Sequence, residues 1–263
     1  MTQETSLSAK IESIKAITIW LLVKFAEKVQ NKQEIYSRNI LAKSLSLIEA
    51  IYKLYTQKLY DEGWTLFRTL IDRYVYLIYL YEKDLFDEFE KWSFIRAYEY
   101  NSSIRSDEKY KLLLNDPLFK IDKKQTKRYY SLKTEENNWS KPDPESILKA
   151  NGLDFLYKYG YDYSSGHIHP VFGDGELEFY KYTGLEPNPF THLNQQILVR
   201  NTIIVNSLIQ REVFNRLRFK FRKIVYQYLD ETLPMINNEA NEFDLTVYRI
   251  LKMIESKISL FEE

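Results

Sequence analysis

Hydrophobic residues recur along most of the chain at the spacing of an α-helix. In residues 5–30 the apolar positions have a period near 3.6 residues. They are Ile11, Ile14, Ile17, Leu21, Phe25 and Val29. Further helices are predicted over residues 36–58, 62–82, 85–105, 143–149, 153–168, 192–217 and 242–261. The pattern predicts an all-α fold, a single helical bundle of about 7–9 helices.

Two segments interrupt this pattern. A lysine-rich connector is predicted over 106–142, between N-terminal helices in 5–105 and C-terminal helices in 143–263. An irregular loop is predicted near 170–190, a stretch that holds three of the seven prolines and three of the seven glycines. We expect all of these segments to belong to one domain, residues 1–263, with the loop beside a site.

Composition and charge narrow the function classes. The 263 residues include 37 basic and 37 acidic side chains, so the chain lacks the basic excess typical of nucleic-acid or membrane-surface proteins. The absence of cysteine excludes disulfides, thiolate metal sites and a cysteine nucleophile. The apolar stretch 64–81 contains Arg68, Asp72 and Arg73, which argues against a membrane-spanning helix. The sequence predicts a cytoplasmic protein that does not associate with membranes.

A narrow polar stripe marks the helix predicted over 62–82. Five polar residues fall on one face of a helix that is otherwise apolar: Thr65, Arg68, Thr69, Asp72 and Arg73. So wide an apolar arc predicts a central helix whose stripe faces either water or an internal polar cleft. Arg68 and Asp72 are four residues apart and can pair along the helix. They form either a structural ion pair or a site in which Arg68 faces an anionic group.

Two of the three histidines lie close together in the sequence. On a helix, Tyr161, Ser165 and His169 share one face, whereas His167 points elsewhere. Pro170 disfavours helical geometry at His169, which places His169 at a helix C-terminus where the helix dipole favours the protonated imidazole. A protonated imidazole can act as a general acid or bind a phosphate. The alternative is a histidine that caps its helix and hydrogen-bonds to neighbouring polar side chains.

The order of these elements resembles that of a bacterial all-α domain family of unknown function. Members of that family carry an Arg-x-x-x-Glu element and, later, a Tyr-x-x-x-Ser-x-x-x-His element. The resemblance covers residues 40–100 and 153–172, and Asp replaces the usual Glu here. It implies that five residues occupy the family positions: Arg68, Asp72, Tyr161, Ser165 and His169.

A more distant similarity is to the HEPN superfamily, helical domains that include metal-independent ribonucleases of toxin–antitoxin and phage-defence systems. It implies an endoribonuclease or effector that needs no metal or other cofactor. In such an enzyme His169 would transfer a proton and Arg68 would stabilise charge on the phosphate. HEPN domains carry the arginine shortly before the histidine, whereas here Arg68 would come from another helix. A homodimer that brings two His169 faces together would compensate for the missing arginine near His169.

Two basic and aromatic stretches are candidates for binding the RNA backbone. The first, residues 120–133, contains Lys124 and Lys127. The second, residues 211–223, contains the remaining three candidates at helical spacing: Arg216, Lys220 and Lys223. A solvated helix face over an apolar core is the alternative for the second stretch.

Two other functions stay open from the sequence. One is a non-catalytic interaction or sensor subunit that binds a protein partner, which the 22 tyrosines favour because tyrosine is enriched at interfaces. The other is metal-dependent hydrolysis at His167 and His169, with Asp174, Glu176 or Glu178 as further ligands. Because no firm third ligand is identifiable, no metal site is predicted. Phosphate-binding loops, dinucleotide fingerprints and nucleophile elbows are absent from the sequence.

Overall fold

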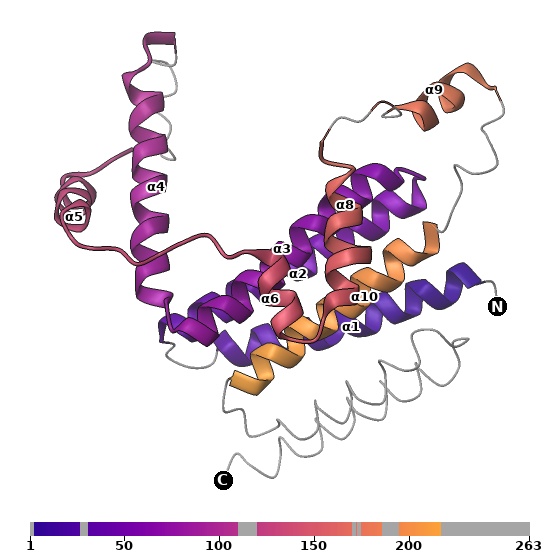
Figure 1. Cartoon of the computed structure of the whole chain (residues 1–263), viewed down its shortest axis with the longest axis horizontal. Coiled ribbons are helices and arrows are strands. Elements are labelled where there is room, and N and C mark those ends of the chain that lie inside the picture. The colour runs from indigo at the N-terminus through magenta and orange to yellow at the C-terminus, as the bar shows by residue number, and fades with distance from the viewer. Residues whose placement is uncertain are drawn as a thin grey trace, which may run out of the picture. The chain divides into compact units, whose positions relative to one another are not determined.

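The computed structural model confirms the all-α fold class over the residues that it describes, which contain no strand. These are residues 3–26, 31–109, 120–169, 172, 175–185 and 195–216. The long helices are α1 (Gln3–Ala26), α2 (Lys32–Thr56), α3 (Tyr60–Lys83), α4 (Phe86–Ser106) and α10 (Gln195–Arg216) (Figure 1). The shorter elements are α5 (Lys123–Lys133), α6 (Pro144–Ala150), α7 (Asp154–Leu156), the π-helix η3 (Tyr157–Asp162), α8 (Tyr163–Ser165) and α9 (Glu176–Thr183).

The chain divides into two compact units. The main unit takes its described residues from 1–79 and 142–263, and the α4–α5 unit takes its own from 80–141. The expectation of one domain over 1–263 stays a prediction. None of the described helices combines the length and the apolar character that crossing a membrane requires.

The core of the main unit lies where α1, α2 and α10 pack alongside one another (Figure 1). The apolar positions that recur in these helices are buried, among them Leu21, Ile48 and Ile209. A buried polar contact also joins α10 to α1, because Gln210 Nε2 donates to Thr18 Oγ1 at 2.7 Å. The helical period of the sequence therefore corresponds to the faces that these helices bury against one another.

Helix α3 also belongs to this core, through its wide apolar arc. Phe67, Leu70 and Ile71 are fully buried. At Gly63 the backbone of α3 approaches α10 so closely that a Cβ atom would lie 2.6 Å from Leu198 Cδ2. The prediction of a central helix with a narrow polar stripe agrees with this burial.

The segment 106–142, predicted to be a connector, contains the helix α5. Asp122 begins α5 with a capping box, in which its side chain accepts from the Gln125 backbone N–H. Helix α5 packs against α4 in the α4–α5 unit. The ring of Tyr129 stacks on that of Tyr98, with centroids 4.1 Å apart and planes at 13°. This aromatic packing comes from another helix, so the polar composition of the segment did not reveal it.

The predicted loop near 170–190 also contains a helix, α9. Gly175 precedes it with φ 82° and Gly184 ends it with φ 69°, both left-handed conformations that glycine adopts easily. The glycines that indicated a loop therefore mark the two ends of a short helix. The predicted helix over 242–261 and the part of 192–217 before Gln195 and after Arg216 lie outside the described residues.

The helical run predicted over 153–168 is divided into α7, η3 and α8. Asp143 begins the preceding helix α6 as predicted, accepting from the Ser146 backbone N–H with Pro144 in the first turn. Gly160 of η3 lies against α3, where an added Cβ would be 3.0 Å from Ile71 Cδ1. This close approach places the α7–α8 segment along the polar stripe of α3.

Candidate functional site

Arg68 is the centre of a polar cluster between α3 and the α7–α8 segment. Its Nε donates to Ser165 Oγ at 3.0 Å, and its Nη1 forms an ion pair with Asp72 on the same helix. Its Cζ lies 3.2 Å from the centroid of the Tyr161 ring. Only 13% of the Arg68 side chain is exposed. The structure thus brings together four of the five predicted site residues: Arg68, Asp72, Tyr161 and Ser165.

Local contacts orient the two partners of Arg68 that come from the α7–α8 segment, a hydrogen bond for Ser165 and ring stacking for Tyr161. Ser165 Oγ donates to the Tyr161 carbonyl at 2.7 Å, which leaves its lone pairs free to accept from Arg68. The Tyr161 ring stacks in turn on Tyr157, with centroids 5.8 Å apart. Both side chains are therefore held in place before any ligand binds.

His169, the fifth predicted residue, lies apart from this cluster. It is exposed, and its backbone N–H donates weakly to the Ser165 carbonyl at 3.4 Å. Among the described residues its imidazole makes no hydrogen bond or ring contact. The structure therefore does not join His169 to Arg68.

His167 lies instead against the polar stripe of α3. Its Nδ1 is 3.1 Å from Asp61 Oδ1, and its carbonyl accepts from Thr65 Oγ1 at 3.2 Å. Its ring lies nearly parallel to that of Trp64, at 13°, with centroids 6.1 Å apart. The expectation that His167 points elsewhere is wrong, because the segment no longer follows a regular α-helix at this point.

Sequence reasoning missed Asp61 and Trp64 as site residues. A signal was present, since Asp61 lies four residues before Thr65 and extends the polar stripe by one turn. Burial raises the pKa of Tyr163, which also packs against His167, and the nearby Asp61 carboxylate raises it further. The Tyr163 phenol therefore stays neutral at neutral pH beside the imidazole.

The arrangement offers two chemical capacities on one face of α3. The Asp61 carboxylate, 3.1 Å from His167 Nδ1, favours a proton on that nitrogen and leaves the other nitrogen to exchange a proton. A guanidinium with five N–H donors can bind an anion such as phosphate. Among the described residues no group of three His, Cys, Asp or Glu side chains could hold a metal ion, and Asp174 lies outside them.

The predicted RNA-binding residues fall in two regions. Lys124 and Lys127 are exposed on α5. Arg216, at the end of α10, forms an ion pair with Glu212 at 2.7 Å. Lys220 and Lys223 lie outside the described residues. The structure therefore gives geometry for only part of the two predicted stretches.

Comparison with known proteins gives one family match. Residues 34–179 match the model of a family of unknown function, DUF5677. No curated protein and no solved structure gives a significant match to the chain. The matched region contains the whole Arg68 cluster together with Asp61, His167 and His169. Because the match covers more than half of the 263 residues, the chain belongs to the DUF5677 family of unknown function.

Proposed function

We propose that this protein is a metal-independent endoribonuclease, similar to HEPN nucleases, that acts in a bacterial defence or toxin–antitoxin system. The observation that supports the proposal is that one face of α3 carries both Asp61, which contacts the His167 imidazole, and the Arg68 guanidinium. Asp61, which holds His167, and Arg68 are two turns apart on α3. Proton transfer and phosphate stabilisation are the two tasks that RNA cleavage without a metal requires.

The proposed reaction is an attack of the ribose 2′-hydroxyl on the adjacent phosphorus. A 2′-O–P bond forms and the P–O5′ bond breaks, which leaves a 2′,3′-cyclic phosphate and a 5′-hydroxyl. His167 accepts the 2′-hydroxyl proton, while the exposed His169 or water donates a proton to the 5′-oxygen. Arg68 stabilises the negative charge that develops on the phosphate oxygens. Asp61 and Asp72 orient the imidazole and the guanidinium.

The test is cleavage of tRNA and total RNA by the purified protein in EDTA. We expect cyclic-phosphate products from the unaltered protein, and losses of at least about 100-fold for Arg68→Ala and His167→Ala, the scale of a general base or charge-stabilising group. Because His169 has water as a substitute donor, His169→Ala should lose less. Lys158→Ala, at an exposed position of η3, serves as the control. Absence of cleavage, or cleavage that survives both Arg68→Ala and His167→Ala, would contradict the proposal.

A non-catalytic interaction or sensor subunit is the second candidate function, and a specific surface favours it. The rings of Phe155 and Tyr159 lie against each other, with centroids 5.3 Å apart, and their exposed fractions are 62% and 54%. Large exposed aromatic side chains on one face are typical of surfaces that bind another protein or a second copy of the chain. Sedimentation velocity of the Tyr159→Glu variant tests the homodimer. Loss of a dimer with unchanged RNA cleavage would favour this surface as an interface.

A further inference from the structure

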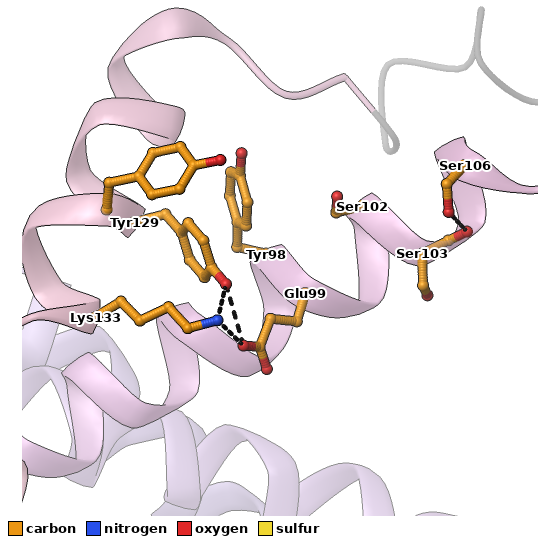
Figure 2. A pocket seen from close by; sticks show the side chains of 8 residues that line it. Tyr98, Glu99, Ser102, Ser103, Ser106, Tyr129 and Lys133 are labelled. Carbon is orange, nitrogen blue, oxygen red and sulfur yellow. Dashed lines mark hydrogen bonds and ion pairs between the residues drawn. The ribbon is translucent and has the colours of Figure 1, made fainter.

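A polar groove lies between α4 and α5 in the α4–α5 unit, with a volume of about 470 Å³ (Figure 2). Helix α4 contributes three serines, Tyr98 and Glu99, and α5 contributes two tyrosines and Lys133. The groove combines aromatic rings, hydroxyl groups and a charged pair in one place. This is the composition of a site for a planar, polar ligand.

One wall of the groove is held by a network of side-chain contacts. Figure 2 shows Lys133, Tyr129 and Glu99 converging, with Lys133 Nζ donating to Tyr129 Oη at 2.6 Å and to Glu99 Oε1 at 3.4 Å. Tyr129 Oη donates to the same carboxylate at 3.2 Å. These hydrogen bonds, that to Tyr129 foremost, raise the pKa of Lys133. The wall therefore keeps its charge and its shape before a ligand binds.

Tyr130 presents an open aromatic face at the groove. It meets Tyr129 edge to face, with centroids 5.3 Å apart and planes at 68°, and is 64% exposed. Among the described residues no other ring lies parallel to that of Tyr130. An exposed aromatic ring beside a polar groove is typical of sites that stack an unpaired base.

The serine hydroxyls of α4 favour a ligand that donates hydrogen bonds. Ser103 Oγ donates to the Tyr100 carbonyl and Ser106 Oγ donates to the Ser103 carbonyl, each at 2.8 Å. Their protons are used within α4, so toward the groove they offer only lone pairs. A ligand that carries N–H or O–H donors, such as a base amino group or a ribose hydroxyl, matches these acceptors.

Exposed lysines lie on the same face of α5 as Tyr130. Lys123 and Lys127 precede Tyr130 by seven and three residues, which is helical spacing. Neither has an ion-pair partner among the described residues. Lysines next to a stacking ring are the arrangement that binds the phosphates of a single strand.

We propose that this groove binds an unpaired nucleobase of single-stranded RNA, which stacks on Tyr130 while Lys123 and Lys127 contact the flanking phosphates. The choice of RNA as the ligand rests on the proposed function. Binding at the groove does not itself require cleavage, so the two proposals can fail separately.

The experiment measures binding of a fluorescent single-stranded RNA by anisotropy, using the full chain with His167→Ala to prevent cleavage. Adding Tyr130→Ala is expected to raise the Kd on the order of tenfold, the effect of losing one base–aromatic stack. Tyr100→Ala is the matched control, because Tyr100 is 66% exposed on α4 but does not line the groove. Lys127→Ala is expected to weaken binding and to reduce its salt dependence. Circular dichroism verifies the helical content of each variant.

Two further ligands test whether the groove requires both an unpaired base and flanking phosphates. Duplex RNA and a free nucleoside monophosphate are expected to bind more weakly than the single strand, since one has no unpaired base and the other lacks flanking phosphates. Equal Kd values for the Tyr130→Ala and Tyr100→Ala variants, or equal binding of duplex and single strand, would overturn this inference. Tyr130-dependent binding by a protein that cleaves no RNA would instead overturn the ribonuclease proposal alone.

Discussion

At the scale of single residues, Arg68 makes contacts that a lysine could not reproduce. Its planar guanidinium lies over the Tyr161 ring and also reaches Ser165 and Asp72 with separate nitrogens. A lysine ammonium is a compact point charge that cannot stack or form this fork. Replacing Arg68 by lysine therefore separates the role of its charge from the role of its shape.

We predict that Arg68→Lys lowers the free energy of unfolding by about 1–3 kcal/mol, because the stack on Tyr161 and the partly buried hydrogen bond to Ser165 are lost. Urea unfolding measures the change. Arg96→Lys is the matched control, since Arg96 is exposed on α4. Equal unfolding midpoints for the two variants would show that the Arg68 cluster contributes no stability through its geometry.

At the scale of elements, the π-helix η3 determines how the α7–α8 segment meets α3. Gly160 has no side chain, and a Cβ there would lie 2.9 Å from Leu156 Cδ1 and 3.0 Å from Ile71 Cδ1. Both neighbours are buried, so they have little room to move. The glycine permits the close approach that places Tyr161, the next residue, over Arg68.

We predict that Gly160→Val lowers the free energy of unfolding by about 1–3 kcal/mol, the usual cost of overpacking a core contact. It should also separate Tyr161 from Arg68 and reduce any RNA cleavage. Lys158→Val is the control, because it places the same side chain at an exposed position of η3. Thermal unfolding and the cleavage assay are the measurements, and a Gly160→Val protein as stable as the control would contradict the prediction.

At the scale of the whole molecule, the two units differ in how much they bury. Helices α2 and α10 each contain several fully buried apolar residues, such as Ile48 and Ile203. In contrast, Phe86 is the one buried residue of α4 and Tyr129 the one buried residue of α5. Fewer buried contacts indicate a lower local free energy of opening.

We therefore predict that backbone amides in α4 and α5 exchange with deuterium at least about tenfold faster than those in α2 and α10, after correction for intrinsic rates. Hydrogen exchange followed by mass spectrometry on the full chain tests this. Equal protection in both sets of helices would show that the two units open together.

The helices show how far the sequence alone could go. The apolar period of α1, α2 and α10 is a local property, because each helix buries one face. The sequence alone therefore predicts these helices. The Asp143–Pro144 start of α6 is also local, because the cap acts within one turn. Helices α5 and α9 were missed, since the first depends on Tyr129 packing on another helix and the second on glycines that also signal loops.

For the candidate site, the sequence by itself determined the pairs that one helical turn can bring together. Arg68 with Asp72 and Tyr161 with Ser165 follow from a spacing of four residues. Only the tertiary structure decided that these pairs meet, because Arg68 and Ser165 are separated by 97 positions. It also decided that His167 rather than His169 lies against α3, where Asp61 binds it. Contacts between distant segments depend on which helices pack together, and the apolar period marks the buried face of each helix without identifying the segment that covers it.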